Sequence, residues 1–181
     1  MALTKSTVNK LKKIVGKSNF SMEAEDLACY SYDANIKGHL PEAVVFPGTT
    51  DEISEILKLA NIELFSIIPR GSGTGMTGGS IPLNDCVIMA MSRFNRIINI
   101  DKENLVANVE PGVITGRFQN AVETLGLFYP PDPSSADYCT LGGNLAECAG
   151  GPRAVKYGVT RDYVLGVEAV LATGDIIRTG V

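Results

Sequence analysis

The sequence predicts an α+β protein in which an N-terminal helical segment (residues 1–41) precedes a domain of two lobes (residues 42–181). The small lobe, up to about residue 90, is expected to be a β-α-β unit, because two apolar runs flank a segment with helical spacing. The larger lobe is expected to be mostly antiparallel, because short apolar runs there alternate with turn residues. A glycine-rich stretch, residues 69–79, lies within the small lobe.

The N-terminal segment has the spacing of two helices. Apolar side chains recur at helical intervals from Val8 to Val15, and Gly16 ends the pattern. Ser21 has a side chain suited to capping a short helix over residues 22–29.

The β-α-β unit follows directly. Residues 43–46 are expected to form a buried strand, and Thr49 with Glu52 forms a capping box at the start of a helix carrying the apolar positions of residues 53–60. Residues 65–68 are then a strand that leads into the glycine-rich stretch. Ligands bind at the carboxyl ends of strands in open α/β sheets, so this stretch is in a favourable place for a site.

In the larger lobe, capping and turn residues indicate where helices and strands end. A helix is expected to be capped by Thr115 and to end at Gly126, and residues 101–104 are a candidate hairpin turn. The strands expected after the glycine-rich stretch are residues 86–91, 97–100, 105–110, 163–171 and 176–179.

Residues 69–79, here called the glycine loop, contain five glycines in eleven positions and no lysine. Glycine is retained where φ is positive or where a group comes close to the backbone, and successive N–H groups can then converge on an anion. Gly73, Gly75 and Gly78 match G-x-G-x-x-G, but the Rossmann version needs a helix that Pro82 would break. We therefore expect a pyrophosphate-binding loop of another kind; the alternative is a mobile surface loop.

A second set of glycine and proline clusters lies in the larger lobe. Residues 129–135 are stiffened by three prolines and offer two serine hydroxyls as donors. Two glycine pairs lie before and after Asn144. These features favour a backbone that lies against a flat or anionic ligand, while the alternative is a run of tight turns.

Composition excludes several classes of function. The net charge of −4 argues against nucleic acid as a partner, since phosphate neutralisation needs clustered Lys and Arg. No apolar run approaches the ~20 residues of a membrane span and no signal peptide is recognisable, so we expect a cytoplasmic protein. Four scattered cysteines and the single His39 predict no metal site.

The ordered motifs resemble one known family. They are Ala43–Pro47, Pro69–Gly75, Val109–Gly112, Pro131–Ser135, Gly142–Asn144, Ala149–Gly151 and Tyr157–Gly158. This set is similar to the FAD-binding domain of the vanillyl-alcohol oxidase/PCMH superfamily, and within it to the FAD-linked subunits of glycolate oxidase and to D-lactate dehydrogenases. The resemblance runs from about residue 20 to the end, and implies a two-lobed PCMH-type fold with FAD extended between two subdomains.

The resemblance also implies which residues bind the cofactor. Those around the pyrophosphate would be Pro69, Arg70, Gly71, Ser72, Gly73, Thr74, Gly75, Thr77, Gly78 and Gly79. Those along the flavin and ribityl chain would be Pro131, Ser134, Ser135, Gly142, Gly143, Asn144, Gly150 and Gly151, with Tyr157, Gly158, Val164 and Val167 nearby.

Two departures from the family pattern concern the flavin. Members often carry Asn at the position of Cys148, and members with covalent flavin use His or Cys at set positions, including a His in the glycine loop. No His lies in that loop here, so the resemblance implies non-covalent FAD, with Cys148 as the residue that could contradict this.

The implied activity is oxidation of a 2-hydroxy acid such as glycolate or D-lactate. Electrons would pass to a quinone, a cytochrome, or an iron–sulfur or flavoprotein subunit, and membrane association would come through such a partner. The alternatives are a non-redox or sugar-linked flavoenzyme of the same fold, of the ether-lipid synthase or peptidoglycan-precursor reductase type, and a nicotinamide-binding Rossmann module.

Family members continue into a cap that holds the catalytic groups. We therefore expect residues 1–181 to be an N-terminal fragment that has no complete catalytic apparatus and that self-associates through its last strands.

Overall fold

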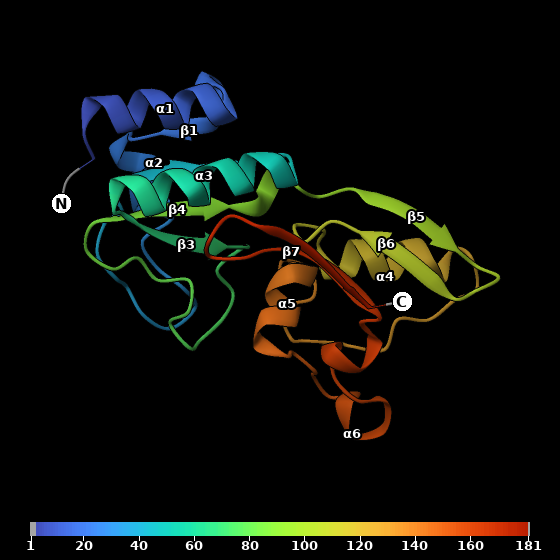
Figure 1. The fold of residues 1–181 in the computed structure, drawn as a ribbon. Helices are drawn as coiled ribbons and strands as arrows, with labels where there is room; N and C mark the ends of the chain where they lie inside the picture. The colour runs from blue at the N-terminus through green and yellow to red at the C-terminus, as the bar shows by residue number, and fades with distance from the viewer. Residues whose placement is uncertain (1–2, 181) are drawn as a thin grey trace. The chain divides into compact units, whose positions relative to one another are not determined.

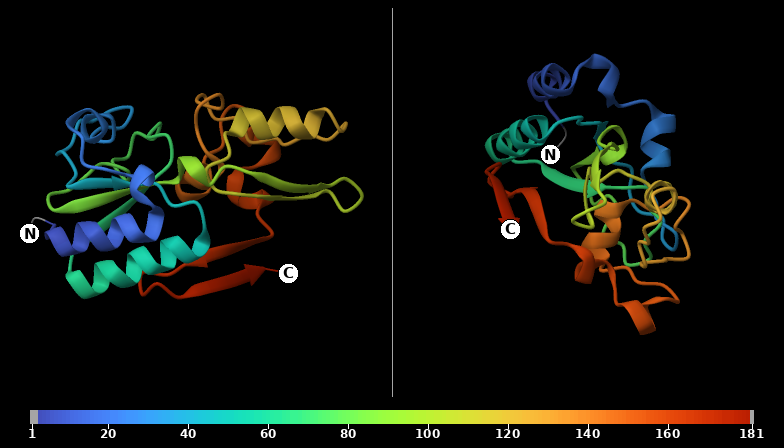
Figure 2. Two further views of the ribbon diagram at one scale, coloured as in Figure 1. Left: turned by 90° about the horizontal axis from the view of Figure 1, so that it is seen from above. Right: turned by 90° about the vertical axis from the view of Figure 1, so that its right-hand side faces the viewer.

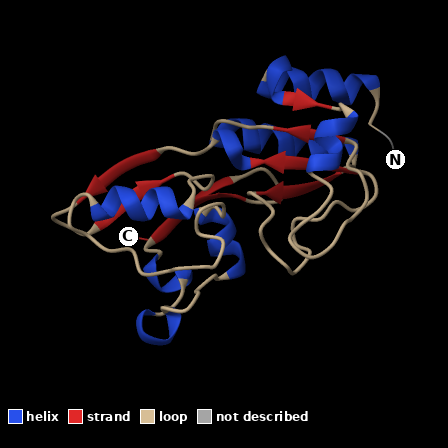
Figure 3. Cartoon of the chain, turned by 180° about the vertical axis from the view of Figure 1, so that it is seen from behind, coloured by secondary structure: helices blue, strands red, loops and turns tan. Residues whose placement is uncertain are grey.

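The computed structural model describes residues 3–180, and their helices and strands fall into two compact units (Figure 1). Unit 2 is the continuous segment Phe94–Val164, and unit 1 comprises the described residues before and after it. Both units mix helices with small sheets (Figure 3), so the predicted α+β class is confirmed.

Unit 1 is built on a four-stranded sheet in the order β1-β2-β4-β3. Its strands are β1 (Phe20–Ser21), β2 (Ala43–Val45), β3 (Ser66–Arg70) and β4 (Cys86–Ala90). β4 pairs in parallel with both β2 and β3, and β1 is antiparallel to β2. Every residue of β4 is buried, because a parallel strand in the middle of a sheet is covered on both faces. Pro69 is tolerated in β3 because that strand is at the edge.

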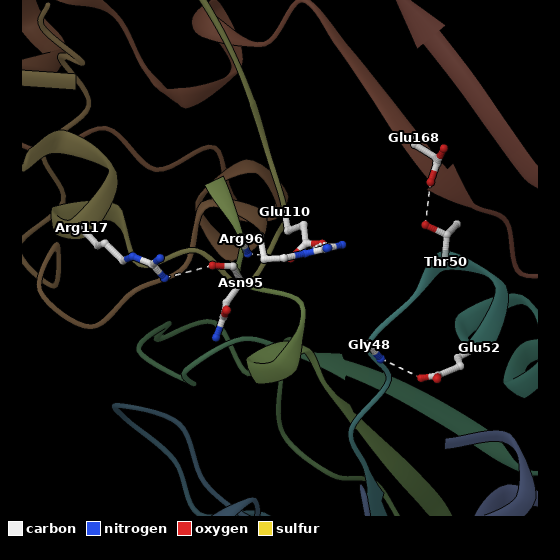
Figure 4. Close-up of polar contacts among 8 residues, drawn as sticks. All are labelled: Gly48, Thr50, Glu52, Asn95, Arg96, Glu110, Arg117 and Glu168. Carbon is white, nitrogen blue, oxygen red and sulfur yellow. Dashed lines mark hydrogen bonds and ion pairs between the residues drawn. The ribbon is translucent and has the colours of Figure 1, made fainter. Parts of the chain in front are cut away.

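The helices of unit 1 are α1 (Lys5–Val15), α2 (Ala24–Cys29) and α3 (Thr50–Glu63), with the 3-10 turns η1 (Lys17–Asn19) and η2 (Met91–Arg93). The predicted cap of α3 is confirmed at Thr49, whose hydroxyl accepts the N–H of Glu52 at 3.1 Å. The other half of the capping box differs, because the Glu52 carboxylate accepts the N–H of Gly48 at 2.7 Å (Figure 4). The cap of α2 is Glu23 rather than Ser21, whose hydroxyl instead accepts the N–H of Glu23.

A hairpin of β7 (Gly166–Val170) and β8 (Ile176–Gly180) belongs to unit 1 and lies along α3 (Figure 2). The hydroxyl of Thr50 donates to Glu168 at 2.6 Å (Figure 4), and that of Ser54 donates to the Gly174 carbonyl at 2.6 Å. These bonds explain why the chain after Leu165 is grouped with unit 1, whereas we expected everything after residue 90 in the larger lobe.

Unit 2 carries the hairpin of β5 (Ile97–Asp101) and β6 (Val106–Val109), the helices α4 (Thr115–Glu123), α5 (Leu141–Glu147) and α6 (Ala154–Tyr157), and the 3-10 turn η3 (Thr160–Tyr163). The predicted hairpin turn at residues 101–104 is confirmed. A core of Val113, Phe118 and Val122 packs against the hairpin and the residues that flank α4.

Two details of unit 2 and one of the strand that follows it differ from expectation. The cap of α4 is Ile114, and Thr115 is already inside the helix. The strand expected to begin at Tyr163 begins at Gly166, since η3 occupies the preceding turn. Helix α5 was not expected, because its sequence contains two adjacent glycines.

Candidate functional site

The chain leaves β3 at Arg70, passes through the glycine loop and returns to the sheet at Cys86. No helix begins in residues 71–85, as the break expected at Pro82 predicts. The loop thus starts at the carboxyl end of an edge strand, and turns rather than helical structure set its course.

The Arg70 side chain is buried and packs against the loop at Gly73. It is 4 % exposed, its Nη1 donates to the Ser80 hydroxyl at 3.3 Å, and its guanidinium lies 5.5 Å from the ring centre of Tyr30 and 6.0 Å from that of Tyr32. Burial lowers its pKa from the usual arginine value. A Cβ at Gly73 would lie 2.2 Å from the same guanidinium, and φ there is +70°, so a larger residue would have to displace the Arg70 side chain and adopt a strained left-handed backbone.

Asp33 fastens the loop from a second segment. Its Oδ2 accepts the N–H of Gly78 at 3.1 Å, and its Oδ1 accepts the N–H groups of Asn35 and Ile36 at 2.8 and 2.7 Å. The bonds from Ile36 and Asn35 hold the pKa of Asp33 below its usual range, and the Gly78 bond acts in the same direction. The Gly78 amide is therefore directed at Asp33.

The outer side of the loop is open. A Cβ added at Gly75 or at Gly78 would meet no heavy atom within 4 Å, and Gly75 has no positive φ to account for its identity. Within residues 3–180, Ser72 and Thr74 make no hydrogen bond to another part of the protein. Open glycines next to unused donors fit the demand of a pyrophosphate, which needs close backbone approach and N–H or O–H groups.

In unit 2, Asn144 is buried and belongs to a polar cluster. Its Nδ2 donates to the Thr115 hydroxyl at 2.7 Å, and that hydroxyl lies 3.2 Å from both the carbonyl oxygen and the Sγ of Cys139. The first turn of α5, which contains Gly142 and Gly143, is capped by Thr140, whose hydroxyl accepts the N–H of Gly143 at 3.2 Å. Asn144 thus fixes the start of α5 on the helix that begins at Thr115.

Most glycines of unit 2 are enclosed by protein. A Cβ at Gly142 would lie 2.6 Å from the Pro111 side chain, and one at Gly151 would lie 1.7 Å from the Asp132 carbonyl oxygen. A Cβ at Gly158 would lie 2.4 Å from Asp162. These three glycines are explained by packing within the unit.

The motif Val109–Gly112 holds this packing in place. Glu110 is 3 % exposed, and it accepts the backbone N–H of Arg96 at 2.6 Å and the Nε at 2.8 Å (Figure 4). The bond to Glu110 raises the pKa of Arg96. The backbone carbonyl of the next residue, Pro111, accepts the N–H of Gly142 at 2.8 Å. A second arginine, Arg117, donates to the Asn95 carbonyl at 3.1 Å (Figure 4).

The structure divides the predicted site residues between the units. Residues 69–79 and Val167 lie in unit 1 and the others in unit 2. Gly150 and Gly151 are brought against residues 131–133, since the Gly150 carbonyl accepts the N–H of Asp132 at 2.8 Å. Tyr157 is half-exposed, and its carbonyl accepts the Tyr163 hydroxyl. Ser134 and Val164 are exposed.

Sequence reasoning missed Asp33, Tyr30 and Thr160, and it gave Thr115 only the role of a helix cap. Thr160 donates from its N–H and its hydroxyl to the Ala149 carbonyl at 2.9 and 2.7 Å. Among these residues only Asp33 could have been suspected from the sequence. An Asp side chain often accepts the backbone N–H groups two and three residues further on and so forms an Asx turn. Its bond to Gly78, 45 residues away, left no trace in local sequence.

Cys148 ends α5 in the left-handed conformation, with φ of +51°. Asn tolerates this conformation better than Cys does, which gives a backbone reason to expect the Asn that the family resemblance implies at this position. Cys148 is half-buried and reduced.

Two kinds of feature are absent from residues 3–180. No three His, Cys, Asp or Glu side chains are grouped to hold a metal ion. No helix there has both the length and the apolar character needed to cross a membrane.

The sequence of this chain is similar to known proteins over residues of both units. The chain is 49% identical over 179 residues to the glycolate oxidase subunit GlcD of Bacillus subtilis, which covers 98% of this chain and 38% of that protein. It is 41% identical over 140 residues to D-lactate dehydrogenase of Anaerostipes hadrus, covering 77% of this chain and 29% of that protein. The chain therefore spans well under half the length of these relatives.

A solved structure of p-cresol methylhydroxylase matches 98% of this chain and 36% of its own, with a TM-score of 0.82 and 28% identity. The expected PCMH-type fold is thereby confirmed. A family model described as FAD binding domain matches residues 41–180. Because that match takes in most of the chain, the protein belongs to the FAD-binding domain family.

Proposed function

We propose that this chain is the FAD-binding part of a flavin-dependent oxidoreductase that oxidises a 2-hydroxy acid such as glycolate or D-lactate. The observation that carries the proposal is the 49% identity to a glycolate oxidase subunit over nearly the whole chain. The similarity to a D-lactate dehydrogenase points to the same substrate class.

In unit 1, the glycine loop is proposed to bind the pyrophosphate of FAD. Gly75 and Gly78 leave space for the phosphates, and Ser72 and Thr74 have donors that no other part of the described chain uses. The buried Arg70 lies against Gly73, and the Asp33 carboxylate interacts with its positive charge, so Arg70 is proposed to support the loop rather than to bind the phosphates. The remaining proposed contacts are Pro69, Gly71, Gly73, Thr77, Gly79 and, on β7, Val167.

In unit 2, the proposed contacts with the flavin and ribityl chain gather around α5. Gly143 is exposed on its first turn, and the buried Asn144 acts by holding that turn in place. The other proposed contacts of unit 2 are Pro131, Ser134, Ser135, Gly142, Gly150, Gly151, Tyr157, Gly158 and Val164.

When bound, FAD supplies the hydride-accepting chemistry, and the protein contributes binding and orientation. We propose that the electrons leave to a quinone, a cytochrome, or an iron–sulfur or flavoprotein subunit. The proposed setting is the cytoplasm, with any contact to a membrane made by that partner.

The test is flavin reduction in the purified protein of which this chain is part. Purification should give a yellow protein, and anaerobic addition of glycolate or D-lactate should bleach its flavin absorbance. A protein that takes up no FAD would refute the proposal. A yellow protein bleached by neither acid would favour the alternative, a non-redox or sugar-linked flavoenzyme of the same fold.

The flavin is proposed to be held non-covalently, because no His lies in residues 69–79 and residues 1–181 contain only His39. Acid precipitation should leave a colourless pellet and a yellow supernatant. Colour that stays with the pellet in the wild type and is lost in Cys148→Ser would identify a covalent link at Cys148.

A further inference from the structure

We propose that Asp33 is a positioning residue that sets the shape of the glycine loop for its phosphate ligand by holding the Gly78 amide. This inference rests on the function proposed above for residues 69–79. Asp33 lies 36 residues before the loop begins and is 6 % exposed.

The two oxygens of Asp33 serve different segments. Oδ1 accepts the N–H groups of Asn35 and Ile36 at 2.8 and 2.7 Å and so closes the turn that Asp33 starts. Oδ2 accepts the N–H of Gly78 at 3.1 Å and so joins that turn to the glycine loop. A neutral side chain with only one acceptor oxygen cannot make both sets of bonds.

Further contacts run between the same two segments. The Ala34 N–H donates to the Gly75 carbonyl at 3.1 Å, and the Gly38 Cα packs against Ile81 so closely that a Cβ there would lie 2.2 Å from its Cγ2. The turn is closed at its base by the bond from the Gly38 N–H to the Ser31 carbonyl, 2.7 Å long. The turn therefore supports the loop on the side of Gly75, Gly78 and Ile81, while Arg70 supports Gly73.

This support is independent of ligand contact. The Gly78 amide points at Asp33, and a carboxylate would repel a phosphate placed against it. Asp33 consequently contributes by fixing φ of +81° at Gly78 and the path of Gly75, both of which leave open space where a Cβ would be. A loop that is already ordered loses less conformational entropy on binding.

The test substitutes Asp33→Asn, which keeps one acceptor oxygen for the turn and presents an NH₂ to the Gly78 amide. Asp101→Asn is the matched control, because Asp101 Oδ1 accepts N–H groups two and three residues on, at 3.0 Å each, in a turn of unit 2. Titration of the apoprotein with FAD should show affinity reduced about tenfold in Asp33→Asn, as expected for one charged hydrogen bond, and little changed in Asp101→Asn.

Amide hydrogen exchange gives a readout that does not depend on FAD. Without cofactor, residues 73–79 should exchange faster in Asp33→Asn than in the wild type, and β4 should be unchanged. Equal exchange in this segment and equal FAD affinity would overturn the proposal. If the wild type binds no FAD, the proposed function fails, and exchange still decides whether Asp33 orders the loop.

Asp33→Ser provides a second variant in case Asp33→Asn does not fold. A serine hydroxyl can close the same kind of turn but cannot reach Gly78 as well. It should show the same faster exchange in residues 73–79, and wild-type exchange there would count against the proposal.

Discussion

A Cβ atom added at Gly75 or Gly78 would meet nothing within 4 Å, whereas one added at Gly142 or Gly151 would lie 2.6 Å from Pro111 and 1.7 Å from the Asp132 carbonyl oxygen. Both regions are rich in glycine, and both belong to the motifs that indicate the family. In unit 2 the protein itself occupies the space beside the glycine. At the outer side of the glycine loop the space is left for something else, so glycine content alone does not identify a ligand-binding backbone.

The largest expected effect is in the enclosed region. Gly151→Ala should reduce the free energy of unfolding by about 3 kcal/mol or more, since a left-handed φ of +86° and a collision with backbone act together. Urea unfolding measures this. Gly126→Ala is the control, with φ of +74° and open space around its Cβ. It should lose only the stability that a left-handed backbone costs an alanine. Equal losses in the two variants would remove the distinction between enclosed and open glycines.

Gly75→Val tests the open region. Its φ is not positive and its Cβ position is open, so the free energy of unfolding of the apoprotein should change by less than about 1 kcal/mol. The side chain would fill the space proposed for phosphate, and FAD affinity should fall roughly a hundredfold, about 2.7 kcal/mol. Fluorescence titration measures the affinity. If Gly75→Val binds FAD as well as an exposed substitution on α3, Lys58→Ala, the loop does not contact the pyrophosphate.

Gly78→Ala and Gly126→Ala form a matched pair. Both glycines have positive φ and nothing near their Cβ positions, so each variant should be destabilised by about 1–2 kcal/mol. Only Gly78→Ala should also weaken FAD binding, because Gly126 lies in the turn that follows α4 and is not among the proposed cofactor contacts. Comparison of unfolding and FAD titration for the pair separates the two effects. Weakened binding in both variants would mean that the loss is a general consequence of instability.

The smallest effect is expected at Cys148. Replacement by Asn, which tolerates the left-handed region, should stabilise the protein by a few tenths to about 1 kcal/mol. Thermal unfolding of the apoprotein is the measurement. A lower melting temperature in Cys148→Asn would show that the Cys148 thiol makes packing contacts that outweigh the backbone strain.

Local sequence predicted the elements whose causes are local. The apolar runs of β2 and β4, the Thr49 cap of α3 and the turn after Asp101 follow from residue type and spacing, and the structure contains all of them. The exclusion of a helix after the glycine loop followed from Pro82 by the same local reasoning.

The elements missed by sequence reasoning depend on distant partners. Helix α5 forms despite Gly142 and Gly143 because Thr140 caps it and the Pro111 carbonyl accepts the Gly142 N–H. Asp33 acts through an amide 45 residues away. The return of β7 to α3 depends on Glu168, which Thr50 contacts across 118 residues. No window of neighbouring residues contains such information.

That last contact has a consequence for the order of events during synthesis. Unit 2 is one uninterrupted stretch of chain, whereas unit 1 is completed only by residues that follow it. Ribosomes add about 5–20 residues per second, so the 118 residues that separate Thr50 from Glu168 take roughly 6–24 s to appear. During that interval the Thr50 hydroxyl at the start of α3 has no Glu168 carboxylate to accept its hydrogen bond. Unit 2 can finish folding first. A chaperone that binds nascent chains would therefore meet unit 1 as the part that is exposed for longest.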